Sequence, residues 1–116
     1  MTAGERPAII VAAGAGVGAA HLAEVLLGLE EEGIPYRVEA WPGADAGELA
    51  HRAAVASRLG VGVGAAGSVV AVTTEKLPAG RAYITGQLNA TRELDRGIGA
   101  NAARLVKRLP LFELRT

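Results

Sequence analysis

Apolar residues occur along this chain in short runs that predict five strands. Residues 6–13 (RPAIIVAA) are apolar and partly β-branched, as in a strand buried on both faces of a sheet. Residues 36–41 (YRVEAW) alternate in polarity and predict a second strand. A third strand of glycine and valine is predicted at 59–66 and a fourth at 69–74. The segment 77–86 predicts a loop that leads into a short fifth strand.

Three other segments repeat their apolar residues with the period of a helix. The first helix is predicted from about residue 19 to residue 32, where Gly33 can close it and Pro35 prevents its continuation. Its apolar residues are spaced i, i+3, i+4 and i+7, and they are Leu22, Val25, Leu26 and Leu29.

The second helix is predicted from about 46 to 58, after Asp45, which with Glu48 resembles a capping box. The third is predicted from about 91 to 108 and is ended by Pro110. One stripe of the third helix is apolar, made by Leu94, Ile98, Ala102, Leu105 and Leu109.

The order of elements is β-α-β-α-β-β-β-α, and Gly67-Ser68 offers a tight turn for a hairpin between the third and fourth strands. Strands separated by helices favour parallel pairing. We therefore expect an α/β fold of the Rossmann-like, three-layer type. It would have an open, mostly parallel sheet, helices on both faces and one β-hairpin, in a single domain that covers residues 1–116.

Composition removes several classes of function. The 12 basic and 12 acidic residues balance, so the chain lacks the charge excess typical of proteins that bind nucleic acid or anionic membranes. The sequence has no cysteine, which excludes disulfides and thiolate chemistry, and no apolar run approaches the roughly 18 residues of a membrane span. We expect a soluble cytoplasmic protein. Its 16 glycines and 3% aromatic residues fill a core thinly, which favours an obligate complex with a partner subunit.

Residues 14–19 (GAGVGA) match the G-x-G-x-x-G/A pattern of dinucleotide sites, and Glu39 follows at a suitable distance for a ribose. A small nucleotide-binding domain that uses Gly14, Gly16 and Gly18 is therefore an alternative. A tight strand-to-helix turn explains the same glycines, because the chain is rich in glycine and alanine throughout and lacks a second mononucleotide half. Ser57, Ser68, His21 and His51 form no nucleophile motif, so no catalytic residue is predicted.

The first helix ends in three acids, Glu30, Glu31 and Glu32, at the negative end of its macrodipole. On a helical wheel Glu31 lies opposite the apolar stripe, and the same outer face carries the residues Glu24, Leu27 and Gly28. A leucine and a glycine on that face favour a surface covered by another protein. A solvated acidic helix end and a contact with a metal ion or a basic partner both fit the pattern.

Three long segments resemble the small subunit of the diol and glycerol dehydratase-reactivating factors. They are GLEEEGIPYRV (28–38), SRLGVGVGAAGSVVAVTTEKLPA (57–79) and LDRGIGANAARLVKRLPLFEL (94–114). In that family the helix end reads G-L-E-E-x-G-[IV]-P, and the last segment reads G-[AS]-N-A-x-x-L-V-K-x-L-P-L. The chain departs from the family in its glycines after the first strand and at Leu27, where tryptophan is frequent. These departures bear on which dehydratase is served.

The resemblance implies a non-enzymatic subunit of a chaperone-like factor. Such factors are heterotetramers of two large ATPase subunits and two small subunits, and they serve adenosylcobalamin-dependent dehydratases. The small subunit is similar in fold to the dehydratase medium subunit and exchanges with it, so that damaged cobalamin leaves. It would work in the cytoplasm or inside a bacterial microcompartment.

In that family the second glutamate of G-L-E-E completes a Mg²⁺ or Ca²⁺ site built mostly by the large subunit, and here this residue is Glu31. The resemblance thus implies Glu31 as a metal ligand, with Glu30 and Glu32 as bystanders and no cation held by the isolated chain. The dehydratase medium subunit itself is the nearest alternative, although it is longer than 116 residues.

Overall fold

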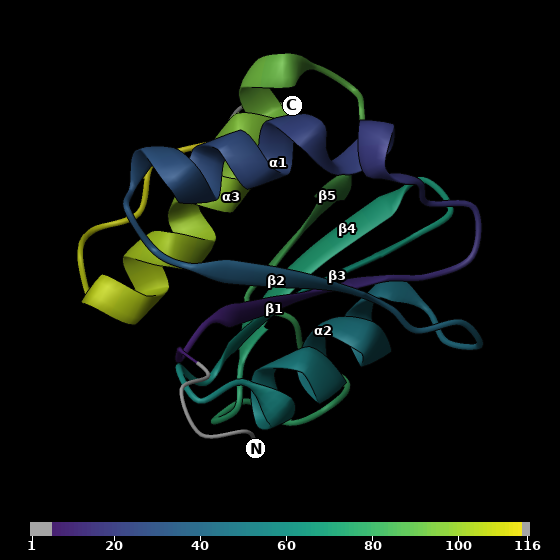
Figure 1. Ribbon diagram of the computed structural model, residues 1–116, viewed down its shortest axis with the longest axis horizontal. Coiled ribbons are helices and arrows are strands. Elements are labelled where there is room, and N and C mark those ends of the chain that lie inside the picture. The colour runs from purple at the N-terminus through teal and green to yellow at the C-terminus, as the bar shows by residue number, and fades with distance from the viewer. Residues whose placement is uncertain (1–5, 115–116) are drawn as a thin grey trace.

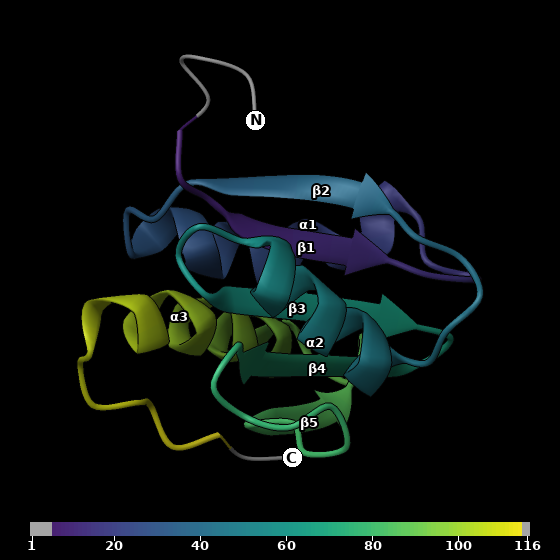
Figure 2. The same cartoon turned by 90° about the horizontal axis from the view of Figure 1, so that it is seen from below.

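The five strands form one mixed sheet in the order β2-β1-β3-β4-β5. The protein is described by a computed structural model that covers residues 6–114. Figure 2 shows the strands side by side in this order, with β2 at one edge and β5 at the other. The strands are β1 (Ile9–Ala13), β2 (Tyr36–Ala40), β3 (Val61–Ala66), β4 (Val69–Thr74) and β5 (Ile84–Gln87).

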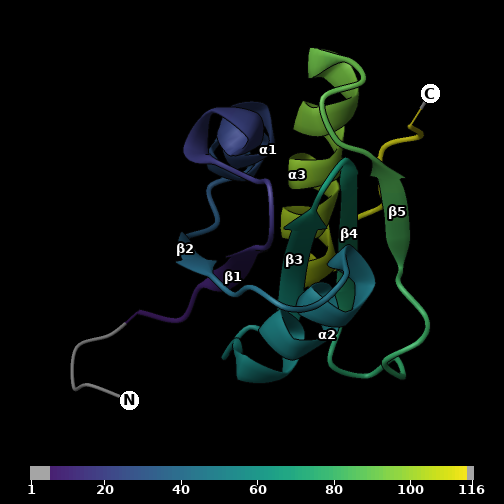
Figure 3. The same cartoon turned by 90° about the vertical axis from the view of Figure 1, so that its right-hand side faces the viewer.

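Three helices cover the sheet, and two of them pack on each other. The helices are α1 (Ala19–Glu31), α2 (Ala46–Ala56) and α3 (Arg92–Lys107). Figures 1 and 3 show α1 and α3 together on one side of the sheet and α2 on the other. No helix in residues 6–114 is both long enough and apolar enough to cross a membrane.

The prediction of a Rossmann-like, mostly parallel sheet is wrong. Only β1 pairs in parallel, with β2 and with β3, whereas β3–β4 and β4–β5 are antiparallel. The reason lies in the connections. A parallel crossover needs a dozen or more residues and usually a helix, but β3 is joined to β4 by two residues and β4 to β5 by a loop without a helix. The predicted hairpin is confirmed, with Gly67 at a φ of +58° in its turn.

The glycines of β3 allow α2 to lie unusually close to the sheet. A Cβ on Gly62 would overlap the backbone at Ala54, and one on Gly64 would overlap the carbonyl oxygen of Ala46. The facing side of α2 is correspondingly made of small buried residues, among them Ala50 and Ala53. The alternation of glycine and valine in this strand therefore determines how closely the α2 layer packs.

Helix boundaries follow the predicted caps with one exception. Gly33, with a φ of +75°, follows the end of α1, and the Asp45 side chain accepts a hydrogen bond from the Glu48 N–H at the start of α2. Helix α3 ends earlier than its apolar stripe, since Arg108 adopts a left-handed conformation with φ +59°. Leu109 consequently lies outside the helix and is exposed, so its placement on the apolar stripe of this helix was wrong.

Candidate functional site

Helices α1 and α3 cross so closely that only glycine fits at the contact. A Cβ on Gly28 would overlap the carbonyl oxygen of Arg96, and one on Gly99 would overlap the carbonyl oxygen of Val25. Gly28 is buried. Its predicted position on an outward face is therefore wrong, because the period of one helix shows which face is less apolar but does not show that α3 covers part of it. The end of α1 is thus held against α3.

Arg96 of α3 lies beside the two acids that share this side of α1. Its Nη2 and Nε donate to Oε2 of Glu24 at 2.7 and 3.1 Å, and its Nη1 lies 3.8 Å from Oε2 of Glu31. The Glu24 side chain is 22% exposed and the Glu31 side chain 56% exposed. The hydrogen bond to Glu24 raises the pKa of Arg96, so the guanidinium stays cationic. Glu24 is the primary partner of Arg96, and Glu31 keeps a largely open carboxylate.

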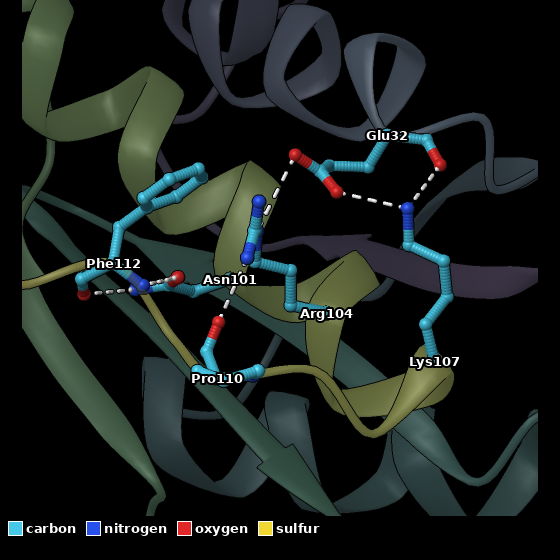
Figure 4. Close-up of polar contacts among 6 residues, drawn as sticks. All are labelled: Glu32, Asn101, Arg104, Lys107, Pro110 and Phe112. Carbon is cyan, nitrogen blue, oxygen red and sulfur yellow. Dashed lines mark hydrogen bonds and ion pairs between the residues drawn. The ribbon is translucent and has the colours of Figure 1, made fainter.

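Glu30 and Glu32 are engaged by different partners. The Tyr36 hydroxyl of β2 donates to Oε1 of Glu30 at 2.7 Å, and this hydrogen bond, together with burial, raises the pKa of Tyr36. Lys107 Nζ donates both to Oε1 of Glu32, at 2.8 Å, and to its backbone carbonyl, at 2.7 Å. Arg104 Nε lies 3.4 Å from Oε2 of Glu32 (Figure 4).

The positive charge missing from the last turn of α1 is therefore supplied by α3. Lys107, which donates to the backbone carbonyl of the C-cap residue Glu32, offsets the negative end of the macrodipole. The hydrogen bond from Lys107, and then the charge of Arg104, hold the pKa of the Glu32 carboxyl below its usual range. Of the three consecutive glutamates, Glu31 has the weakest polar contact within residues 6–114.

The segment after α3 folds back along that helix. The buried Asn101 side chain accepts from the Phe112 N–H at 2.7 Å and donates to its carbonyl at 3.0 Å (Figure 4). Arg104 donates to the carbonyl of Pro110 at 2.9 Å and stacks 3.8 Å above the centre of the Phe112 ring. These contacts place Phe112 beside the same end of α1.

Between Phe112 and the end of α1 lies an open groove of about 460 Å³. Its lining combines small, charged and aromatic residues. They are Gly97 and Ala100 of α3, the charged residues Glu31, Arg92, Glu93 and Arg96, and Phe112. Leu27 of α1 is 40% exposed.

Glu31 can offer a metal ion one ligand. Hard cations such as Mg²⁺ and Ca²⁺ prefer carboxylate oxygens, but they need six or more ligands. Residues 6–114 contain no group of three acidic, histidine or cysteine side chains that could hold a metal. An exposed single carboxylate fits a site completed by another protein.

The glycine-rich turn between β1 and α1 is occupied by internal hydrogen bonds. The Gly14 N–H donates to the carbonyl oxygen of Ala65 at 2.7 Å, and the Gly18 N–H donates to Nδ1 of His21 at 2.9 Å. Glu39, the acid expected for a ribose, accepts from Arg37 at 2.9 Å and from Trp41 at 3.1 Å. The turn thus has the properties of a strand-to-helix connection, with Gly16 at a φ of +78°.

Residues 6–112 match the family model described as dehydratase medium subunit. The chain is 40% identical over 91 residues to the diol dehydratase-reactivating factor small subunit of Klebsiella michiganensis, covering 78% of this chain and 73% of that protein. It is 39% identical over 107 residues to the propanediol dehydratase-reactivating factor small subunit of Citrobacter freundii, covering 92% and 91%.

Two solved structures share the fold. A glycerol dehydratase reactivase chain superposes with a TM-score of 0.88 at 36% identity, over 93% of this chain and 98% of that chain. A diol dehydratase-reactivating factor solved with ADP and Mg²⁺ also gives a TM-score of 0.88, at 37% identity, over 94% and 100%.

Proposed function

Because the chain belongs to the dehydratase medium-subunit family, and within it to the small subunits of diol and glycerol dehydratase-reactivating factors, we propose that it exchanges with the medium subunit of such a dehydratase. The exchange would open the dehydratase and release damaged cobalamin. The observation that carries this proposal is the match of nearly the whole chain, in sequence and in fold, to small subunits of these factors.

The chain would act as a binding subunit with the ATPase activity on a large partner subunit. In residues 6–114 Glu30 and Glu32 at the end of α1 bond to groups of the same chain, and the N–H groups of Gly14 and Gly18 in the glycine-rich turn donate to Ala65 and His21. The internal hydrogen bonds of the turn support placing nucleotide binding on the partner. The ADP and Mg²⁺ belong to the solved diol dehydratase-reactivating factor, and for this chain we place nucleotide hydrolysis on the partner.

The large subunit would dock over the end of α1 and the adjoining groove. Glu31 would then contribute one carboxylate to a Mg²⁺ or Ca²⁺ ion completed by that subunit, with Leu27 and Glu24 at the same interface. The Glu31 carboxylate, which is 56% exposed, supports this assignment. The guanidinium of Arg96 would compete with a metal ion for the Glu31 carboxylate. Its hydrogen bonds to Glu24 leave only a 3.8 Å contact with Glu31.

Co-expression of the tagged chain with a large reactivase subunit and its dehydratase tests the assembly. We expect a stable complex with the large subunit, equal numbers of large and small subunits, and ATP hydrolysis only when the large subunit is present. ATP or diol turnover by the purified chain alone, or failure to bind any large subunit or dehydratase subunit, would overturn the proposal.

A further inference from the structure

The outer edge of β2 has no partner strand within residues 6–114 and carries a regular set of outward-facing backbone groups. Strand β2 is the last strand of the sheet on its side, and no other strand in residues 6–114 pairs with that edge (Figure 2). The Pro35 carbonyl accepts from Ile9 and the Trp41 N–H donates to Ala13, so the odd-numbered residues of the segment bond to β1. By the parallel ladder, the N–H and C=O groups of Tyr36, Val38 and Ala40 point away from the sheet.

The side chains on this edge are half apolar and half charged. Val38, at its centre, is 43% exposed. Arg37 and Glu39, the neighbours of Val38 in the strand, have their side chains on the opposite face of the sheet, 42% and 33% exposed. Arg37 Nε lies 2.9 Å from Oε2 of Glu39. Trp41 Nε1 donates to the second oxygen of Glu39, which fixes the direction of that carboxylate. A charge of each sign thus stands on either side of an exposed valine.

We propose that this edge pairs with the β2 edge of a second copy of the same chain, antiparallel and centred on Val38. A two-fold axis at Val38 lets the two valines exchange both of their backbone hydrogen bonds, and it pairs Tyr36 of each copy with Ala40 of the other. Arg37 of each copy then lies opposite Glu39 of the other at non-hydrogen-bonded positions, where facing side chains are closest.

The two neighbouring registers of this strand pair bring like charges together. Only the even-numbered residues of β2 direct their backbone N–H and C=O groups away from the sheet. The nearest alternative antiparallel registers therefore have their two-fold axis at residue 37 or at residue 39. The first places Arg37 opposite Arg37, and the second places Glu39 opposite Glu39, and like charges directly opposite each other destabilise a strand pair. The register centred on Val38 is the one among these three that pairs opposite charges twice.

The opposite edge of the sheet offers no such match. Strand β5 has four residues, Ile84–Gln87, and none of them is charged. An antiparallel pairing of β5 with itself would therefore have no complementary charges to define its register. A β2 pair is short, so its buried area falls at the weak end of specific interfaces, and we expect a concentration-dependent dimer of micromolar or weaker affinity.

The test is sedimentation velocity on the full chain from micromolar to millimolar concentration. The average mass of the wild-type chain should rise from 11.8 kDa towards twice that value. Arg37→Glu and Glu39→Arg each replace two opposite-charge contacts by two like-charge contacts and should weaken the dimer about tenfold or more. An equimolar mixture of the two variants restores both opposite-charge pairs and should dimerise again.

Matched control variants show whether the charge changes act through pairing at the β2 edge or through a general change in attraction between chains. Arg52 and Glu48 form an exposed ion pair on α2, so Arg52→Glu, Glu48→Arg and their mixture make the same charge changes away from the edge. These variants should dimerise like the wild type. Val38→Pro removes the central outward N–H without disturbing the bonds to β1 and should be monomeric, with circular dichroism to confirm folding.

A wild-type chain that stays monomeric at millimolar concentration would overturn the proposal. So would a dimer that survives both Val38→Pro and Arg37→Glu, or charge-reversed variants that fail to recover on mixing. The experiment uses the chain alone, and its result does not depend on whether the chain serves a dehydratase.

Discussion

At the scale of single residues, the contact between α1 and α3 depends on two glycines. Gly28 and Gly99 face backbone atoms of the opposite helix, and neither position has room for a methyl group. Such glycines in helix interiors are otherwise unfavourable by roughly 0.5–1 kcal/mol relative to alanine. Their presence therefore marks the close crossing that positions Glu31 beside Arg96.

We expect Gly28→Ala to lower the free energy of unfolding by about 1–3 kcal/mol, because the new methyl group would overlap the Arg96 carbonyl. Chemical denaturation measures this change. Gly80→Ala is the matched control, since nothing lies within 4 Å of a Cβ there, and it should stay within about 0.5 kcal/mol of the wild type. Equal effects of the two substitutions would contradict the close crossing.

Asn101 holds the segment after α3 against that helix. Both of its side-chain groups bond to the backbone of Phe112, so Asn101→Ala would leave two backbone groups without partners. We expect a loss of about 1–3 kcal/mol and faster proteolysis between residues 108 and 114. Asn101→Asp keeps the acceptor but places a carboxylate oxygen against the Phe112 carbonyl, so at neutral pH it should destabilise the chain at least as much as Asn101→Ala. Proteolysis of Asn101→Ala at the wild-type rate would contradict this account.

At the scale of elements, the C-terminus of α1 is stabilised by α3 through Glu32. The pKa of the Glu32 carboxyl is lowered in the folded chain, so the ion pair stabilises the fold above the ordinary pKa of glutamate. That stabilisation is lost as the pH falls below about 4, through the lowered pKa of the folded state.

Glu32→Gln should therefore lower stability at neutral pH by about 1 kcal/mol and change it little at low pH. Melting temperatures measured across this range test the prediction. Glu30→Gln, which keeps an acceptor for the Tyr36 hydroxyl, should have a smaller effect at neutral pH. A Glu32→Gln effect that is the same at pH 3 and pH 7 would contradict the ion-pair account.

Most elements, but not their assembly, could be predicted from the sequence. Local patterns located β1, the hairpin turn at Gly67 and the end of α1 at Gly33, because each depends on residues close in the chain. A mostly parallel sheet was predicted in place of the mixed one. The sequence already argued against parallel pairing of β4 and β5, because the loop between them contains no helix. The position of Arg96 beside Glu24 depends on residues 72 apart, which no local pattern reveals. Helix-interior glycines in both α1 and α3 were the available sign of that contact.

At the scale of the whole molecule, the three consecutive glutamates differ in their contacts. Glu30 and Glu32 bond to groups of the same domain, whereas Glu31 has an exposed carboxylate that, under the proposed function, meets a partner. Glu31→Gln should therefore leave the melting temperature of the isolated chain unchanged, within about 0.5 kcal/mol in stability. It should weaken association with the large subunit and make that association less dependent on Mg²⁺ or Ca²⁺.

Titration of the large subunit with each variant, in the presence and absence of divalent cation, measures this effect. Glu30→Gln is the matched control and should bind like the wild type. A loss of binding shared equally by Glu30→Gln and Glu31→Gln would indicate a diffuse acidic surface and would contradict the metal assignment.

The most direct test of the central claim is the release of cobalamin from an inactivated dehydratase. The dehydratase, loaded with damaged cofactor, is incubated with ATP and the large subunit, with or without this chain, and free cobalamin is measured after filtration. The account predicts release only when the chain is present, together with the appearance of the dehydratase medium subunit in complex with the large reactivase subunit. Equal release without the chain, or release without any exchange of subunits, would contradict it.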